Sequence, residues 1–477
     1  MVTRQRKGGE KPAKSGSGKS AAAVATTKKP KDMETILNEA SHQPQAPFPL
    51  VGLFVFFLCL AAGLLTPPLM SEPRVATEQS VPVPTLNRQT EQQPESGAVE
   101  SVGFRLCSEE RLQNFWHDEY VPGLHIVCFD APDDSLHLRF YSGGTRQVKS
   151  KHVGLPLAWA GLQRLMESEM NLPRPETWSQ PWAVFSDQGE RLLEANQWEE
   201  KRGTFTGLLT TRFGMVLVYE GGQFMWPGVN VGFKRTANLY SLMPVRSPDM
   251  GNKQQIVTLE TLSLVPLVLS VEGFLSDDEC DHIKRRAEPL MEYSQVTLMD
   301  KDAGRPASDF RTSQTCFLRD RDAILTDIDY RTASLIRMPR DHQEDVQVLR
   351  YGLEEKYDSH HDFFDASLYQ NDASTLALIK NGKRNRFATV FWYLSEVEAG
   401  GQTVFPRMDR RREISMRDCS GGLKVQPQKG KVIIFYNMLG DGTTDTYSLH
   451  GACPVESGVK WAGNKWIWNE PMSFVPA

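Results

Sequence analysis

Alternating apolar and polar residues predict a first folded region between residues 102 and 245. The runs LHIVCFD (124–130) and LHLRFYSGG (136–144) alternate like two paired strands, and AWAGLQRLMESEM (158–170) has the apolar spacing of a helix. In GMVLVYEGGQFMWPGV (214–229), the pair Gly221-Gly222 predicts the turn of a hairpin. We therefore expect a small α+β module at 102–245, whose role the pattern does not reveal.

A second folded region is predicted from residue 260 to 477. FLSDDECDHIKRRAEP (274–289) begins with a capping box from Ser276 to Glu279, and DAILTDIDYRTASLI (322–336) repeats apolar residues on one helical face. After Val346 the pattern changes to six short strands: VQVLRY, ATVFWYL, QTVFP, LKVQP, KVIIFYN and KWIWN. Two helices followed by many short strands favour helices packed on a β-sandwich or jelly roll.

An uninterrupted apolar run, FPLVGLFVFFLCLAAGLLTPPLM (48–70), stands apart from both regions. At a rise of ~1.5 Å per residue it is long enough for a bilayer core of about 30 Å, although its prolines shorten the secure helix. A cleaved signal peptide or a buried core helix would be the alternatives. The long basic stretch before the run and the low-complexity sequence on both sides favour a transmembrane signal anchor.

Charge is distributed unevenly around this run. Residues 1–47 carry nine Lys and Arg against four Asp and Glu, whereas the whole chain has a net charge of −5. The positive-inside rule therefore predicts a single-pass type II protein with a disordered cytosolic head at 1–47. Residues 71–101 are rich in Pro, Glu, Gln and Ser and predict an extended stalk. With a net charge of −5, the chain shows no sign of a broad basic surface, and we expect no nucleic-acid partner.

Candidate metal ligands lie in YDSHHDFFD (357–365), which precedes or opens a predicted strand. Side chains two residues apart in a strand point the same way, so His360 and Asp362 face one side and His361 faces the other. The same argument would place Asp358 beside them. A facial triad for non-haem Fe(II) needs one more histidine, and the only one after His361 is His450.

Five blocks between about 272 and 469 resemble the prolyl 4-hydroxylase family of 2-oxoglutarate- and Fe(II)-dependent dioxygenases, in the form of the membrane-anchored plant and algal enzymes. In order, the blocks are FLSDDECDHIKRRAEPLMEYS, FRTSQTCFL, VLRYGLEEKYDSHHDFFD, RFATVFWYLSEVEAGGQTVFP and SLHGACPVESGVKWAGNKWIWN. The resemblance implies a double-stranded β-helix, also called a jelly roll, with packed helices.

The resemblance also implies a role for individual residues. His360, Asp362 and His450 match the iron ligands, and Lys460 matches the residue that binds the far carboxylate of 2-oxoglutarate. Tyr351 and Thr389 match positions that help to hold the co-substrate, and Tyr357 matches a residue on the substrate side. His361 would be a packing residue or would support a metal ligand from behind, and Asp358 and Asp365 would be solvated. Lys465, five residues after Lys460, is expected to be an ordinary surface lysine on a strand.

The activity implied is 4-hydroxylation of peptidyl proline, coupled to oxidative decarboxylation of 2-oxoglutarate to succinate. Fe(II), 2-oxoglutarate, O2 and ascorbate are the implied cofactors, and a proline-rich polypeptide is the implied substrate. The sequence leaves two alternatives: an oxygenase that acts on another residue or a small molecule, and a catalytically silent, membrane-tethered binding protein. Because of the predicted anchor, we expect the protein to lie in the endoplasmic reticulum or Golgi membrane, with its catalytic domain in the lumen.

Cysteines are compatible with that compartment. One of the seven lies in the apolar run, and the other six permit three disulfides in an oxidising lumen. Cys107–Cys128 is the most local pairing. Cys419–Cys453 would brace the loop that carries His450.

Overall fold

The computed structural model describes residues 107–130, 135–154, 157, 159–173, 182–192, 214–241, 254–411, 417 and 419–472. All of them belong to one compact unit, Pro94–Ala477. None of the helices in these ranges is both long and apolar enough to span a bilayer. The predicted head, anchor and stalk (1–101) lie outside the described residues.

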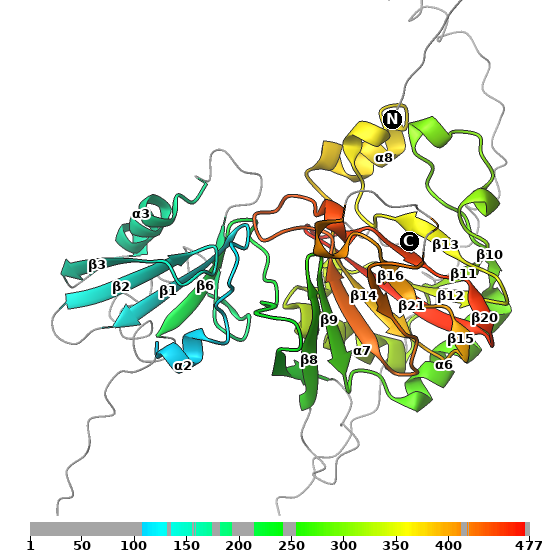
Figure 1. The fold of residues 1–477 in the computed structure, drawn as a ribbon, viewed down its shortest axis with the longest axis horizontal. Coiled ribbons are helices and arrows are strands. Elements are labelled where there is room, and N and C mark those ends of the chain that lie inside the picture. Colours follow the sequence, from blue (N-terminus) through cyan, green and yellow to red (C-terminus); the bar gives the residue numbers. More distant parts are fainter. Residues whose placement is uncertain are drawn as a thin grey trace, which may run out of the picture. The chain divides into compact units, whose positions relative to one another are not determined.

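The N-terminal module is built on a six-stranded sheet, shown in Figure 1, in the order β3-β2-β1-β6-β4-β5. Its strands are β1 (Leu124–Asp130), β2 (Ser135–Ser142), β3 (Val148–Gly154), β4 (Ala183–Phe185), β5 (Arg191–Leu192) and β6 (Met215–Tyr219). The predicted pairing of β1 with β2 is confirmed. Helix α3 (Trp159–Met170) is confirmed as well and buries Leu162, Met166 and Met170 against one face of the sheet. The short helix α2 (Glu109–Leu112) precedes β1.

The predicted hairpin at Gly221-Gly222 is wrong. Strand β6 ends at Tyr219, and the next strand, β7 (Lys234–Tyr240), belongs to the other large sheet. Trp226 explains the difference, because its Nε1 donates to the Leu335 carbonyl at 2.7 Å and its backbone N–H donates to the Tyr436 hydroxyl at 3.0 Å. The chain after the turn is thus packed into the C-terminal core. The N-terminal sheet ends before residue 234, where the first strand of the C-terminal sheet begins, and not after residue 245 as the sequence suggested.

The C-terminal region is β-rich and jelly-roll-like. Its nine-stranded sheet has the order β10-β11-β12-β21-β14-β18-β9-β8-β7, and it faces a four-stranded sheet in the order β13-β19-β16-β17. Side chains from both sheets, among them Leu349, Phe405 and Phe435, form one buried cluster between them. The remaining strands of the large sheet are β8 (Gln254–Leu264), β9 (Leu267–Glu272), β10 (Glu292–Tyr293), β11 (Gln314–Leu318), β12 (Val346–Tyr351), β14 (Arg386–Tyr393), β18 (Val432–Tyr436) and β21 (Lys460–Trp468).

The smaller strands are β13 (Tyr357–His360), β16 (Thr403–Phe405), β17 (Leu423–Val425) and β19 (His450–Ala452), with β15 (Ala399–Gly400) and β20 (Val455–Ser457) in a separate pair. Single 3-10 turns lie at Glu288–Leu290, Asp300–Asp302, Ala307–Asp309, Arg340–His342, Ala366–Leu368, Lys380–Gly382, Met408–Arg410 and Thr446–Ser448.

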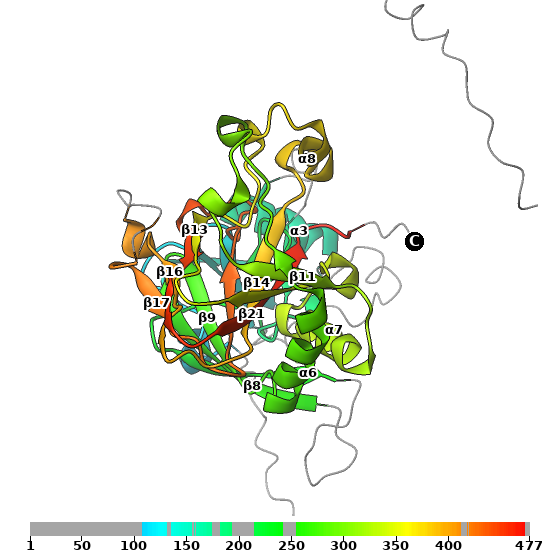
Figure 2. The same ribbon diagram turned by 90° about the vertical axis from the view of Figure 1, so that its right-hand side faces the viewer.

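Helices cover the other face of the nine-stranded sheet. Helix α6 (Asp277–Ala287) has the predicted capping box and buries Cys280, Ile283 and Ala287, and α7 (Ala323–Ile336) packs beside it. The short helix α8 (Ala373–Leu378) lies apart from these two. Figure 2 shows α6 and α7 on one side of β14 and β21, with β16 and β17 on the other. Strand β21 is therefore buried on both faces.

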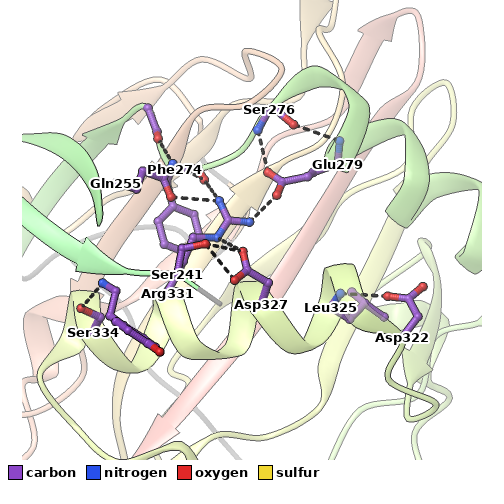
Figure 3. Close-up of polar contacts among 12 residues, drawn as sticks. Ser241, Gln255, Phe274, Ser276, Glu279, Asp322, Leu325, Asp327, Arg331 and Ser334 are labelled. Atoms are coloured by element: carbon purple, nitrogen blue, oxygen red, sulfur yellow. Dashed lines mark hydrogen bonds and ion pairs between the residues drawn. The ribbon is translucent and has the colours of Figure 1, made fainter. Parts of the chain in front are cut away.

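A buried ionic network joins the two long helices (Figure 3). Arg331 of α7 pairs with Glu279, the capping-box residue of α6, and its Nε lies 3.0 Å from Asp327. Arg331 also donates to the Phe274 carbonyl, and Ser241 donates to the Asp327 carboxylate at 2.9 Å. The network fixes the start of α6 against α7 and the end of β9.

Replacing Arg331 by methionine is expected to lower the free energy of unfolding by roughly 3 kcal/mol, because it leaves the buried Asp327 carboxylate without its cation. Urea denaturation followed by circular dichroism measures the change. Arg285→Met, on the exposed face of α6, is the control and should be nearly neutral. An Arg331→Met protein as stable as this control would show that the network contributes nothing net.

Two of the predicted disulfides are present, Cys107–Cys128 and Cys419–Cys453. The third is not formed, because Cys280 and Cys316 are both free and buried. Burial raises the pKa of each of these thiols to about 11, so both are unreactive at neutral pH.

Candidate active site

Three side chains converge where β13 pairs with β19. The antiparallel register places His360 directly opposite His450, and Asp362 follows two residues after the end of β13. The Nε2 atoms of His360 and His450 lie 3.8 Å and 3.6 Å from the Asp362 carboxylate oxygens. One ligand atom from each residue lies within 4.8 Å of the other two. A strand late in the chain thus lies beside the strand that carries the His-x-Asp pair.

Backbone carbonyls fix the orientation of both imidazole rings. His360 Nδ1 lies 2.9 Å from the Asp358 carbonyl, and His450 Nδ1 lies 3.0 Å from the Ser448 carbonyl. A carbonyl oxygen can only accept, so Nδ1 carries the proton and the Nε2 lone pair is free to bind a metal. Burial, with a smaller contribution from His450, lowers the pKa of His360 to about 3 and keeps its ring neutral.

A chain of hydrogen bonds holds the Asp362 carboxylate. The Thr389 hydroxyl donates to Oδ2 at 2.7 Å, and Asn437 Nδ2 donates to the Thr389 hydroxyl at 3.0 Å. Burial opposes ionisation, but the two histidines, Arg386 and the Thr389 hydrogen bond hold the pKa of the carboxyl below its ordinary value. Thr389 thus orients a predicted ligand, a role that the sequence did not reveal.

The cluster fits a divalent transition metal. Two neutral imidazole nitrogens and one carboxylate oxygen on one side of an ion form the two-histidine, one-carboxylate arrangement typical of non-haem Fe(II). His361 stays outside, since its Nε2 bonds the Thr446 carbonyl at 3.1 Å. Asp358 also stays outside, but the expectation that it is solvated is wrong, because it is half-buried and paired with Lys356 and Arg417. Asp365 is exposed, as expected.

Lys460 lies fully buried at the start of β21, opposite Tyr351 of β12. Within the described part of the chain its Nζ has no hydrogen-bond partner, and it lies 5.2, 5.6 and 5.9 Å from the ring centres of Tyr351, Phe391 and Tyr393. Burial lowers the pKa of this amine to about 7. An unpaired buried cation is costly, so this pocket is built to receive an anion.

The Tyr393 and Thr403 hydroxyls are also buried in this core, and they lie close enough to each other to interact. Sequence reasoning missed both residues. The signal for Thr403 was a hydroxyl residue next to the apolar pair Val404 and Phe405 in the predicted strand QTVFP. With Lys460 they offer one cation and two neutral donors, which suits a carboxylate.

Lys465 is not the surface residue that the sequence suggested. It is 1% exposed, and its Nζ lies 2.6 Å from Asp329 of α7. Lys465→Ala would break a buried ion pair and is therefore unsuitable as a neutral control for Lys460.

Tyr357 forms one wall next to the metal cluster. Its ring stacks on His360 at 3.7 Å, and the Arg311 guanidinium lies 4.6 Å over its other side. Arg311 is 5% exposed, and its Nη2 has no hydrogen-bond partner among the residues that the structure describes. Burial raises the pKa of Tyr357 to about 12, so the phenol stays neutral. A free guanidinium N–H beside the cluster can receive a carbonyl oxygen.

The N-terminal module holds the loop that carries His450. This loop runs from Asn437 to His450, and the backbone N–H of Gly221 donates to the Gly440 carbonyl at 2.8 Å. A Cβ on Gly221 would lie 2.5 Å from the Gly442 nitrogen, and one on Gly123 would lie 2.0 Å from the Asp441 nitrogen. No side chain fits between the two backbones.

Gly221→Ala is expected to displace the loop and weaken Fe(II) binding roughly tenfold, the lower end of the loss seen when groups behind a metal ligand are changed. Titration with Fe(II) under argon, with circular dichroism to check the fold, measures this. Gly154→Ala is the control, because a Cβ there meets nothing within 4 Å. Equal Fe(II) affinity in the two variants would show that the module does not position His450.

Comparisons with known proteins identify relatives of this chain. The sequence model of the 2OG-Fe(II) oxygenase superfamily matches residues 346–468. Probable prolyl 4-hydroxylase 7 of Arabidopsis thaliana is 39% identical over 213 residues, which span 43% of this chain and 64% of the plant protein. Prolyl 4-hydroxylase 2 of the same plant is 38% identical over 44% of this chain and 69% of its own length.

Probable prolyl 4-hydroxylase 10 of Arabidopsis thaliana is 33% identical over 274 residues, covering 55% of this chain and 90% of its own. A solved viral collagen prolyl hydroxylase from Paramecium Bursaria Chlorella virus-1 is 27% identical over 42% of this chain and 95% of its own, with a TM-score of 0.30. A score that low carries no argument, so the fold rests on the strands described above. The sequence matches show that the chain belongs to the prolyl 4-hydroxylase family of 2-oxoglutarate- and Fe(II)-dependent oxygenases.

Proposed function

We propose that the protein hydroxylates peptidyl proline at C4 and converts 2-oxoglutarate to succinate and CO2 in the same turnover. One observation carries the proposal: a complete His360, Asp362 and His450 cluster lies in the same core as a buried, unpaired Lys460. An inactive binding protein would be under no pressure to retain both. Fe(II) held by the cluster would supply the oxygen chemistry, with ascorbate as the reductant that keeps it ferrous.

Each neighbouring residue has a task that follows from its contacts. Lys460, Tyr393 and Thr403 would bind the far carboxylate of 2-oxoglutarate, while the Tyr351 and Phe391 rings keep water away from that ion pair. A dry pocket strengthens the attraction between the two charges. The co-substrate would therefore enter in one orientation, with its keto acid end directed at the metal.

The substrate side would be formed by Tyr357 and Arg311. The Arg311 Nη2 can donate to a backbone carbonyl of a polypeptide, and the Tyr357 ring, stacked between His360 and Arg311, would hold that guanidinium beside the cluster. Asp362 remains fixed by Thr389 and Asn437 while substrate binds. Proline-rich polypeptides are the substrate class proposed.

Incubation of the purified protein with Fe(II), 2-oxoglutarate, ascorbate and a proline-rich peptide tests the proposal. We expect a mass gain of about 16 Da per hydroxylation, the mass of one oxygen atom, 4-hydroxyproline after acid hydrolysis, and succinate in equal amount. A matched peptide with alanine for proline should gain no mass. Succinate without peptide oxidation would indicate another residue or a small molecule as substrate, and no succinate at all would indicate a silent binding protein.

We also propose that residues 48–70 anchor the protein as a single-pass type II protein of the endoplasmic reticulum or Golgi membrane. The charge-free apolar run and the basic residues before it support this orientation. Protease added to sealed microsomes should remove only residues 1–47. Digestion of the catalytic region in intact vesicles would reverse the orientation.

A further inference from the structure

A cavity of about 480 Å³ lies where the N-terminal module meets the C-terminal region. The module contributes residues 117–124 and 225–230, and the C-terminal region contributes the β8–β9 turn and the loop 438–447. Buried apolar and aromatic side chains form its floor, namely Leu124, Tyr219, Trp226, Tyr436 and Met438. Concave sites of this size, mostly apolar with a few polar groups, are typical ligand pockets.

Among the residues that line the cavity, acidic side chains outnumber basic ones. Glu119 of the module pairs with Arg410, which also lines the cavity, at 2.6 Å. That pair leaves the carboxyls of Asp118 and Asp445 without a cation among the described residues. His117 does not compensate, because burial lowers the pKa of its imidazole to about 4 and its Nε2 accepts from the Val229 N–H at 3.0 Å.

Asp445 is the buried member of this pair of acids. It is 5% exposed, and only the Tyr447 N–H, at 2.8 Å, donates to its carboxyl within the described residues. Its second oxygen therefore has no partner there. A buried carboxylate with one hydrogen bond is costly unless a cation or further donors reach it. The cavity thus combines apolar walls with an uncompensated negative charge.

The same loop connects the cavity to the metal cluster. Asp445, Thr446 and Tyr447 line the cavity, and the Thr446 carbonyl bonds His361, the neighbour of His360, at 3.1 Å. Three residues after Tyr447 the chain reaches His450. A ligand in the cavity would thus lie behind the loop that carries part of the metal cluster.

We propose that this cavity is a second binding site for the polypeptide substrate, and that it takes an arginine or lysine side chain with its flanking prolines. The cation would pair with Asp445 and Asp118. Aromatic and apolar surfaces suit proline-rich segments, whose extended helix is preformed and loses little entropy on binding. The proposal rests on the proposed prolyl hydroxylation, and it adds that basic residues near the target proline select the substrate.

Two short synthetic peptides test the site, one repeating Pro-Pro-Arg and one repeating Pro-Pro-Gln. Their dissociation constants are measured by isothermal titration on the full chain carrying Asp362→Ala, so that no turnover occurs. The arginine peptide is expected to bind at least ~10-fold more tightly, the difference typical of one charge-assisted hydrogen bond. Asp445→Asn and Asp118→Asn should each reduce that difference. Glu110→Gln, an exposed acid outside the cavity, is the control and should not.

Each outcome decides one part of the proposal. A difference that survives in both Asp445→Asn and Asp118→Asn would overturn the cavity as the cation site. Arginine amide binding as tightly as the arginine peptide would also overturn the proposal, in favour of a small-molecule site. If Asp445→Asn disturbs the fold, the variant Asp118→Asn, at an exposed position, still shows whether the cavity acids cause the preference for the arginine peptide. A preference for the arginine peptide without hydroxylation of either peptide by the wild-type protein would leave the cavity supported and the proposed reaction refuted.

Discussion

Asp362→Ala is expected to abolish conversion of 2-oxoglutarate to succinate, with turnover below roughly 1% of wild type. Changes behind a metal ligand already cost about 10- to 100-fold in affinity or activity, and a lost ligand costs more. Asp362 is the only anionic member of the cluster, and its carboxylate lies within 4 Å of both Nε2 atoms. The measurements are succinate formation and Fe(II) affinity, with circular dichroism to show that the fold remains.

His361→Ala is the matched control for Asp362→Ala. His361 is adjacent in sequence, but its imidazole bonds the Thr446 carbonyl and contributes nothing to the cluster. We expect this variant to retain Fe(II) binding and most of its turnover. Loss of Fe(II) binding in His361→Ala, together with full binding in His360→Ala, would mean that the assigned register of the ligands is wrong by one residue.

Lys460→Ala should raise the Michaelis constant for 2-oxoglutarate by roughly 30- to 4,000-fold. Truncating one partner of a buried, hydrogen-bonded charge pair costs about 2–5 kcal/mol, at about 1.4 kcal/mol for each tenfold change. Fe(II) affinity should hardly change, because Lys460 is not one of the clustered ligands. Steady-state kinetics at varied 2-oxoglutarate and an Fe(II) titration separate the two effects.

The low pKa of Lys460 predicts a pH dependence as well. Burial lowers the pKa of the free amine to about 7, and a bound carboxylate stabilises the charged form and raises that pKa. Above about pH 7, binding must therefore take up a proton, so the Michaelis constant should rise by up to about tenfold per pH unit. The arginine of Lys460→Arg stays charged at these pH values, so this variant should lose the pH dependence. Its larger head group should fit the pocket less well and weaken 2-oxoglutarate binding.

Lys424→Ala is the control for Lys460→Ala, because Lys424 lies exposed on β17. Its kinetics should match wild type at every pH. An unchanged Michaelis constant in Lys460→Ala would show that the unpaired amine does not bind the co-substrate, and the carboxylate pocket would then have to lie elsewhere.

Local spacing indicated candidates for the metal cluster, and the family resemblance was needed to assign the three ligands. His360 and Asp362 share one side of a short segment, and only one later histidine was available as a third ligand. The contact between β13 and β19 then places that histidine opposite the first. Spacing could not exclude Asp358, whose pairing with the distant Arg417 is a tertiary contact.

The two lysines of β21 show where sequence patterns fail. Lys460 and Lys465 are an odd number of residues apart, so they point to opposite faces of the strand. A central strand covered on both sides buries both faces, and no alternation then marks a surface residue. Lys465 meets Asp329 of a helix on one face, whereas Lys460 meets aromatic rings on the other. The role of each lysine depends on the residues that it contacts, and those residues are far away in the sequence.

The failed hairpin has a similar cause. A glycine pair after an apolar strand predicts a tight turn, and Gly222 does adopt a positive φ of 75°. The chain that follows is buried through Trp226 and the Tyr436 hydroxyl instead of returning along β6. Long-range packing overrode the local preference, and the cavity at this junction was invisible for the same reason.

A crystal structure of the protein grown without oxygen, with Mn(II) in place of Fe(II) and with 2-oxoglutarate, tests the central claim most directly. We predict one metal ion about 2.0–2.2 Å from His360 Nε2, His450 Nε2 and an Asp362 oxygen, the range usual for nitrogen and oxygen ligands. We also predict 2-oxoglutarate on the metal, with its far carboxylate within hydrogen-bond distance of Lys460 Nζ. A metal bound by other residues, or a co-substrate whose far carboxylate leaves Lys460 unpaired, would contradict the account.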